Sequence, residues 1–548
     1  MIKRRWIQLI FLWGMAGLAP ACSAESSGDS NRALGEDEYA SEGDADNDWD
    51  GDRDGSQSEN GNDNADADTE EGESVTPEVE TQFDYRIPVS SGRYVFIADT
   101  LNDKVVAVDS VTLEIFTTAV GSTPTHVVPL NDNGEVAVIS LNADEVTLIA
   151  MAPGGTATVR EFDVRPDTNA LAVSPTGRYI IAFFDALFEA DSGIPGTDQE
   201  ISIIDTTPGA EKTYELSVGI HPLRVQFSAD DSRAFAITES GVDIIELAQL
   251  NPSYFPANIS LFDFTEVAPD QTETVIDPAG TVAIGRREDK AEAVVALLDG
   301  SGERRTYPLN GIPTDVDIAA DGTFGLFTIR SAHEAAIFNL PLPADATTSA
   351  MTTVDLGNQY CGAATISGDG QYVALYTSID DDDSNRQVLT VLQRTADGVT
   401  VNGTLLNRNI RGIIPAPDSG ALLVIHEQWS GSGSGLNLPY AYSLVKLPGL
   451  QSKFQQLPVD PTQMLITDDG AFAYMLLSTM EMQIINMNTF IVDSMGLGSL
   501  PEAVGYAANT DRIFISQQHP SGRMTFMDVD GTNVKTITGY TLNDQRTN

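Results

Sequence analysis

Short apolar segments alternate with polar turns along most of the chain. The stretch GRYVFIADTLNDKVVAVDSVT, residues 92–112, holds two β-branched runs, 94–98 and 105–108, on either side of the polar pair Asn102 and Asp103. Two apolar runs around a short polar turn predict a β-hairpin.

This hairpin pattern recurs down the chain. The copies begin at residues 92, 131, 174, 228, 277, 319, 367, 416, 467 and 508. Segments with a Pro and a short apolar strand precede several copies, as in TPTHVVPL and HPLRVQFS, and a further alternating strand such as TYELSV lies between copies. Four short strands per unit are the signature of a β-propeller blade.

The units predict an all-β fold: a single large β-propeller of four-stranded antiparallel blades over residues 83–548. Ten units are counted, and seven to eight blades, the commoner size, is the alternative. We expect the ring to close where FDYRIPV, from Phe83, pairs near the C-terminal strands, because closure leaves no exposed sheet edge. We also expect the propeller to be monomeric.

The units resemble a known repeat family. Kelch and WD-repeat signatures are missing, and Trp429 is the one Trp of residues 83–548. GRYVFIADTLNDKVVAVDSVT instead resembles the consensus sPDG-r-YVan…t-VsViDt-t of YVTN-family surface and periplasmic propellers, and the resemblance covers about residues 84–545. It implies a scaffold motif without a catalytic residue. Propellers of this kind also resemble lactonases and the haem or quinone domains of periplasmic oxidoreductases.

The first 22 residues predict an export signal. A positive start is followed by an apolar run too short to span a bilayer and by LAPAC, which ends in Cys22. This ending resembles a bacterial lipobox, in which the Cys is lipidated, although Ala19 stands where Leu is usual. Ser23 favours, by the same resemblance, an outer-membrane lipoprotein of a Gram-negative bacterium, facing the periplasm or the cell surface. The alternative is ordinary cleavage near Ala21.

Cysteine usage is consistent with lipidation. Cys22 and Cys361 are the two cysteines of the chain, so acylation of the first leaves the second without a disulfide partner. A bridge between them is the alternative, and it would tie a flexible tail to the fold.

The segment that follows the predicted signal is strongly acidic. Residues 23–82 contain 21 Asp or Glu and two Arg, a composition that predicts a disordered spacer. The whole chain has a formal charge of −50, which argues against a nucleic-acid partner. Within the spacer, Asp50, Asp52 and Asp54 match the start of an EF-hand Ca²⁺ loop, but Gly61 stands where the loop needs Glu.

Candidate chemistry is sparse. The chain has no Cys-x-x-Cys-His, P-loop, His-Glu-x-x-His or Gly-x-Ser-x-Gly motif. Polar residues near the start of predicted innermost strands could form a ligand-binding ring at a mouth of the central channel; they are His126, His221, Arg224, Asp315, Gln463 and Glu502. A loop of four acids could bind Ca²⁺; it consists of Asp380, Asp381, Asp382 and Asp383. The alternatives are a solvated mouth and a solvated loop tip.

Three functional classes follow from these features. A membrane-anchored envelope lipoprotein that binds a protein or glycan partner is favoured by the anchor, the spacer and the low catalytic content. The alternative is a lactonase-like or oxidoreductase-related enzyme with a cation in the channel. Ca²⁺ is the candidate cation, and the sequence establishes no cofactor. The third is a structural envelope protein. Fold resemblance alone does not decide among them.

Overall fold

The computed structural model describes residues 88–185, 199–263, 267, 271–342, 350–380, 385–429 and 438–540. Within them the chain forms strands and the short 3₁₀ turns η1 (Leu247–Gln249), η3 (Arg330–Ala332) and η5 (Ala508–Thr510). None of the helical turns in this part of the chain is long and apolar enough to cross a membrane.

The strands form ten antiparallel four-stranded sheets, which we number as blades 1–10 in chain order. Blades 1–5 consist of β1 (Val89–Ser91), β2 (Tyr94–Asp99), β3 (Lys104–Asp109), β4 (Ile115–Ala119); β5 (Pro124–Pro129), β6 (Glu135–Ser140), β7 (Glu145–Met151), β8 (Ala157–Asp163); β9 (Ala170–Val173), β10 (Tyr179–Phe183), β11 (Glu200–Asp205), β12 (Lys212–Ser217); β13 (Pro222–Phe227), β14 (Arg233–Thr238), β15 (Gly241–Glu246), β16 (Ala257–Ile259); and β17 (Thr272–Ile276), β18 (Val282–Arg287), β19 (Glu292–Leu297), β20 (Arg304–Pro308).

Blades 6–10 consist of β21 (Asp315–Ile318), β22 (Phe324–Ile329), β23 (Glu334–Asn339), β24 (Met351–Asp355); β25 (Ala363–Ile366), β26 (Tyr372–Tyr376), β27 (Val388–Thr395), β28 (Gly398–Leu405); β29 (Ile410–Pro415), β30 (Ala421–His426), β31 (Tyr440–Lys446), β32 (Gln451–Leu457); β33 (Pro461–Ile466), β34 (Phe472–Leu477), β35 (Glu481–Asn486), β36 (Val492–Gly496); and β37 (Pro501–Ala507), β38 (Arg512–Gln517), β39 (Arg523–Asp528), β40 (Lys535–Thr538).

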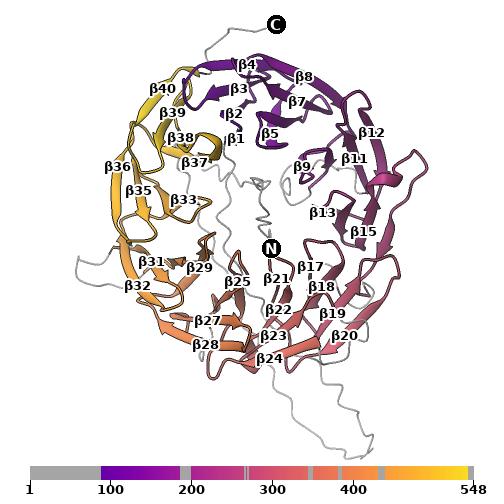
Figure 1. Ribbon diagram of the computed structural model, residues 1–548, viewed down its shortest axis with the longest axis vertical. Coiled ribbons are helices and arrows are strands. Elements are labelled where there is room, and N and C mark those ends of the chain that lie inside the picture. Colours follow the sequence, from indigo (N-terminus) through magenta and orange to yellow (C-terminus); the bar gives the residue numbers. More distant parts are fainter. Residues whose placement is uncertain are drawn as a thin grey trace, which may run out of the picture. The chain divides into compact units, whose positions relative to one another are not determined.

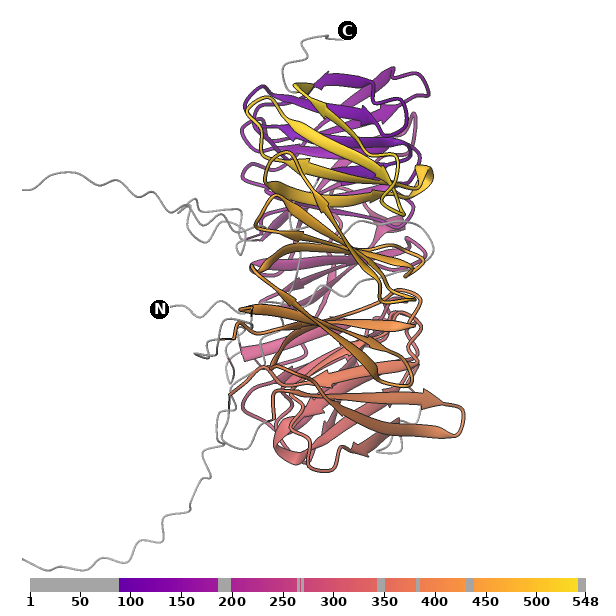
Figure 2. The ribbon, with the colours of Figure 1, turned by 90° about the vertical axis from the view of Figure 1, so that its left-hand side faces the viewer.

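The blades stand side by side in a ring (Figure 1), with the first strand of each blade nearest the centre. Seen from the side, the strands cross the thickness of the ring (Figure 2). Each of the ten sequence units begins in the turn between the first and second strands of one blade and continues into the second strand. The predicted all-β propeller with ten units is therefore confirmed, and the alternative of seven to eight blades is wrong.

Local chemistry explains why the repeated motif forms this turn. Gly177 has φ +73°, and a Cβ there would lie 2.4 Å from the backbone oxygen of Leu130 in the preceding blade. Glycine is the residue that combines this conformation with so close an approach. Beside this glycine, Arg178 donates to Asp205 at the end of β11 at 3.1 Å, and Asp205 also accepts a bond from the Thr207 N–H. The Gly, the Arg and the Asp of the motif thus shape the hairpin.

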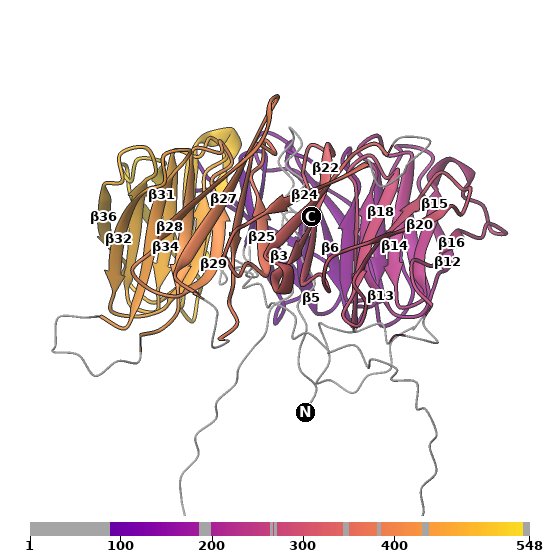
Figure 3. The same ribbon diagram turned by 90° about the horizontal axis from the view of Figure 1, so that it is seen from below.

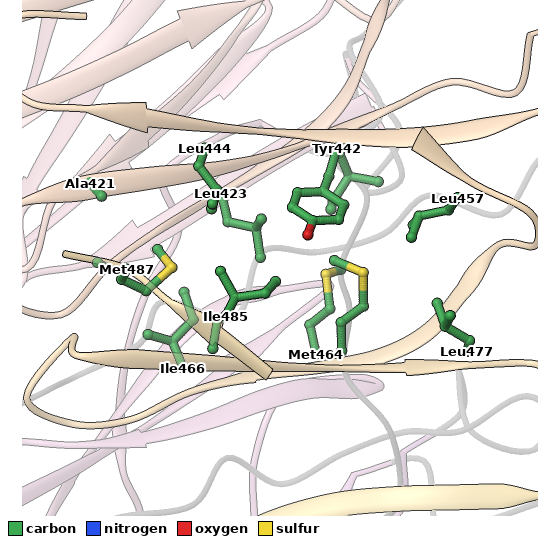
Figure 4. Packing of buried hydrophobic residues seen from close by; sticks show 14 residues of the cluster. Ala421, Leu423, Tyr442, Leu444, Leu457, Met464, Ile466, Leu477, Ile485 and Met487 are labelled. Atoms are coloured by element: carbon green, nitrogen blue, oxygen red, sulfur yellow. The ribbon is translucent and has the colours of Figure 1, made fainter. Parts of the chain in front are cut away.

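The core consists of apolar layers between neighbouring blades. Figure 4 shows the layer between blades 8 and 9, where Leu423 and Tyr442 of one blade face Met464 and Ile485 of the next. Tyr442 is fully buried, and its hydroxyl donates to the Gln483 side chain at 3.0 Å. Each buried side chain of this size stabilises the fold by about 1.5–3 kcal/mol, so packing between blades is a main source of stability.

The ring closes without strand exchange among the described residues. β1 pairs with β2, and blade 10 is built from β37–β40. The Ser110 and Thr510 hydroxyls are 2.7 Å apart, and Ser90 donates to the Tyr506 carbonyl oxygen at 2.7 Å. Of the segment 83–89 that we expect to close the ring, only 88 and 89 are described; Val89 begins β1, which pairs with β2 of blade 1, and the expectation stays a prediction.

Candidate functional site

The predicted channel-mouth residues lie at or beside the first strand of their blades. Four of these strands (β5, β13, β33 and β37), and also β29 of blade 8, carry a register shift near their start. In β13, for example, Pro222 pairs with Thr238 whereas Arg224 pairs with Ile237, so one extra residue stands between them. Such a bulge redirects the side chains that follow it. Pro is tolerated here because an innermost strand needs no N–H on its free edge.

Asp315 and Gln463 each bind the backbone of the next blade. Asp315 of β21 accepts a hydrogen bond from the Ala364 N–H of β25 at 2.7 Å. Gln463 of β33 accepts one from the Val504 N–H of β37 at 2.6 Å. Both side chains are only 4% exposed. A buried N–H without a partner costs about 1–3 kcal/mol, so these two bonds help to hold adjacent blades together.

A line of charged groups extends from blade 4 to blade 6. Arg224 donates to the carbonyl oxygen of Thr274 in blade 5 at 3.2 Å. Burial lowers the pKa of Arg224 to about 10, while the charge of Glu273 opposes that shift. Glu273 accepts a bond from Nε of Arg286 at 2.6 Å, and Arg286 also donates to the Pro313 oxygen of blade 6 at 3.3 Å. Arg224 thus behaves like Asp315 and Gln463, with its side chain directed to the next blade.

Asp315 ends this charged line. Burial, and then the nearby negative charge of Glu273, raise the pKa of Asp315 to about 8; the Arg286 charge and the two backbone N–H donors, from Ala364 and Val316, oppose the rise. A carboxyl that keeps its proton near neutral pH is a candidate acid. Both oxygens of Asp315 already accept backbone hydrogen bonds, which commits the group to the inter-blade contact.

The other three candidates lie apart. His126 is half-buried in β5 of blade 2. His221, just before β13, places Nδ1 3.0 Å from the Glu239 carboxylate, with both side chains 37% exposed. Glu502 is an exposed residue of β37 that accepts a bond from the Ser516 hydroxyl at 3.3 Å. In the described part of the chain, no three His, Cys, Asp or Glu side chains are placed to hold a metal ion.

The remaining predicted residues fall partly outside the described chain. Asp380 is exposed, with a carboxylate oxygen 3.9 Å from the Arg386 guanidinium. Cys361 is a buried free thiol. Outside the described residues lie Cys22, the signal (1–22), the spacer (23–82), Asp50, Asp52, Asp54, Asp381, Asp382 and Asp383. A bound Ca²⁺ and the enzymatic alternative therefore stay predictions.

A groove that the sequence did not indicate lies between blades 6 and 7. Its volume is about 890 Å³, and it is bounded by β23 and β24 of blade 6, by the turns after β21 and β25, and by the β27–β28 hairpin. This hairpin has eight residues in each strand and rises above the neighbouring turns (Figure 3). The lining combines aliphatic side chains, such as Ile337 and Val399, with hydroxyl, amide and carboxylate groups. The polar residues include Thr353, Gln393, Asp321, Asp355 and Asp369.

Arg394 is the cation of this groove. Its guanidinium carbon lies 3.7 Å from the centre of the Phe324 ring, and the group makes a long contact of 3.5 Å with the Gly370 oxygen. Burial lowers the pKa of Arg394, and the charge of Asp321 opposes that shift. Among the described residues Arg394 has no carboxylate within ion-pair distance. The signals in the sequence are the unusually long alternating strands of this hairpin and the Arg next to its turn.

Comparison with known proteins adds no assignment. No protein-family model matches the chain, and no curated protein matches its sequence. Solved structures with similarity include dihydro-heme d1 dehydrogenase NirN in complex with DHE, at 11% identity over 74% of this chain and 73% of that one, TM-score 0.39. A eukaryotic initiation factor matches at 11% identity over 82% and 97%, TM-score 0.48. Apo AztD from Citrobacter koseri matches at 13% over 66% and 93%, TM-score 0.37. At these values the fold assignment rests on the chain's own sheet topology.

Proposed function

We propose that this protein is a YVTN-like propeller lipoprotein that is anchored in the outer membrane of a Gram-negative bacterium and binds a protein or glycan partner of the cell envelope. The groove between blades 6 and 7 is the observation that carries this proposal. Grooves with a few placed polar groups among apolar ones are typical of ligand sites, and this one combines Arg394 with amide, hydroxyl and carboxylate side chains.

The rest of the ring supports a scaffold role. Arg224, Asp315 and Gln463, three of the six predicted channel residues, serve contacts between blades. Rigid blades joined in this way present an outer groove with a fixed shape, which lowers the entropy lost on binding. The lipidated Cys22 and the acidic spacer 23–82 would tether this surface to the membrane while leaving it accessible.

Site-specific photocrosslinking in the native host tests the proposal. A photoreactive residue replaces Thr353 in the groove, and a matched variant carries it at Thr158, an exposed position on the outer strand β8 of blade 2. We expect a discrete crosslinked species from Thr353 that is absent from Thr158. Crosslinks of equal yield from both positions, or none from Thr353, contradict a specific partner at this groove.

A further inference from the structure

The groove offers a strand edge to its ligand. We propose, on the basis of the proposed function, that it binds an extended peptide which adds as a strand to the outer edge of β24 and places an acidic side chain against Arg394. The recognised class is thus a linear peptide segment of another protein, read through its backbone and through one carboxylate.

The lining of the groove shows that it runs along the edge of β24. Within the described residues β24 pairs with β23 alone. Thr352, Thr353, Val354 and Asp355 all line the groove. Because successive strand residues point to opposite faces, four consecutive lining residues show that the groove reaches the edge of β24. Ile337 and Asn339 of β23 also line it, so the groove continues from that edge onto the face of the sheet. The free N–H and C=O groups of that edge are complementary to a peptide backbone.

Arg394 supplies the second point of recognition. Stacking on Phe324 at 3.7 Å restricts the guanidinium plane, and partial burial strips it of some water. A planar, pre-oriented guanidinium binds a carboxylate through two parallel hydrogen bonds. No described carboxylate lies within ion-pair distance to compete for those donors. The geometry therefore favours one acidic group on the ligand.

The surrounding charges set what flanks that acidic group. Asp321, Asp355 and Asp369 line the same groove. They repel a run of acids, which excludes the chain's own spacer 23–82 as the occupant. They favour Lys, Arg or polar side chains around a single Glu or Asp. The five residues of β24 span about 17 Å, so the peptide contact has about five residues.

A peptide is favoured over a glycan by two features of the lining. The strand edge presents alternating donors and acceptors at the spacing of another strand. The lining residues include no aromatic ring on which the face of a sugar would stack, since Phe324 lies buried against Arg394.

The test is selection from a displayed library of random peptides of about eight residues. The full mature protein is the target, and Arg394→Gln protein is used for counter-selection. Arg160→Gln, on the outer strand of blade 2, is the matched control, because Arg160 also spans two blades through Thr206 and Glu211. Thermal melting of all variants confirms folding. Synthetic copies of the selected peptides are then measured by fluorescence polarisation.

We expect selected peptides to carry one Glu or Asp flanked by β-branched and basic residues. Changing that acid to its amide should weaken binding to the wild type at least about tenfold. The same change should have little effect on binding to Arg394→Gln, which lacks the guanidinium that recognises the acid. N-methylation of backbone amides should abolish binding, and Arg160→Gln should bind like the wild type. Failure of any peptide to enrich, enrichment that ignores Arg394, or binding of neutral oligosaccharides alone overturns the inference. A crosslink from Thr353 together with a failed selection overturns this inference and leaves the proposed function standing.

Discussion

The side-chain oxygen of Gln463 in blade 9 accepts a hydrogen bond from the Val504 N–H of blade 10 at 2.6 Å, and both residues are buried. Three blades earlier in the ring, the Asp315 carboxyl group accepts an equivalent hydrogen bond from the Ala364 N–H of the next blade. Residues that look like channel ligands in the sequence therefore contribute to the cohesion of the blades.

Removing the Gln463 amide should destabilise the ring. In Gln463→Leu the Val504 N–H stays buried without a partner, and we expect a loss of about 1–3 kcal/mol in the free energy of unfolding. Urea denaturation followed by circular dichroism measures it. Gln518→Leu, at an exposed position after β38, is the control and should change stability by no more than about 0.5 kcal/mol. Equal stability of the two variants would remove the structural role of Gln463.

Asp315 should make the ring less stable as the pH rises. Its pKa is raised to about 8 by burial and by Glu273, so the folded chain holds a proton that the unfolded chain releases above about pH 3.9. The contribution of Asp315 to stability is therefore fully present below about pH 4 and declines toward pH 8, by up to about 1.4 kcal/mol per pH unit. Asp315→Asn should flatten this decline, measured as unfolding free energy from pH 5 to 9.

The slope and not the absolute stability is the readout for Asp315, because Asn replaces one acceptor oxygen by a donor. Asp144→Asn, which removes an exposed carboxylate, should keep the wild-type slope. An unchanged slope in Asp315→Asn would mean that this carboxyl is ionised in the fold.

His426 should sensitise the protein to acid. It is 1% exposed, with Nε2 2.7 Å from the Ser443 hydroxyl and Nδ1 3.2 Å from the Asn409 oxygen. Burial lowers the pKa of His426 to about 4. The unfolded chain takes up a proton below about pH 6.5 that the folded chain refuses, so stability is lost as pH falls from 6.5 toward 4.

His426→Gln keeps a side chain that can bond to Ser443 but does not titrate. Between pH 6.5 and 4.5 we expect its unfolding free energy to fall less steeply than that of the wild type. The difference between the two slopes should be about 1 kcal/mol per pH unit. His519→Gln, in an exposed turn, serves as the control. A matching acid response of wild type and His426→Gln would argue against this assignment.

The seam between blades 10 and 1 should respond to covalent closure. The described strands are not exchanged there, so the seam depends on an apolar layer that includes Val106 and Phe526 and on side-chain contacts such as that of the Ser110 and Thr510 hydroxyls, 2.7 Å apart. A disulfide from Ser110→Cys with Thr510→Cys would close a very long loop and should add up to about 5 kcal/mol under oxidising conditions. Thermal melting with and without reductant measures the gain, and Ser110→Cys alone is the control. A bridged protein that melts no higher than the reduced one would show that the seam does not open first.

The blades could be predicted from the sequence because their determinants are local. The Gly and Asp turns and the alternation within each hairpin lie within a few residues of one another, as Gly177 and Arg178 show beside β10. Blade number follows from counting these turns. The seam was less predictable: β1 pairs with β2, and contacts between side chains such as Ser110 and Thr510 join blades 10 and 1.

The sites were less predictable because they depend on distant partners. The partners of Asp315 and Gln463 are backbone N–H groups of the following blades, which have no residue signature. Position beside a Pro located these side chains correctly near the inner strands but could not show that they point to the next blade. The groove arises from Phe324 and Arg394, 70 residues apart along the chain, and so left no local motif.

Binding of the cell-envelope fraction to immobilised protein, compared between a groove variant and a channel-mouth variant, tests the central claim most directly. Arg394→Gln removes the groove cation, and Glu502→Gln removes an exposed carboxylate of β37 without touching the groove. Surface plasmon resonance should show binding weakened at least about tenfold by Arg394→Gln and unchanged by Glu502→Gln. Binding that survives Arg394→Gln and is lost in Glu502→Gln would place the site at the channel mouth and contradict the account.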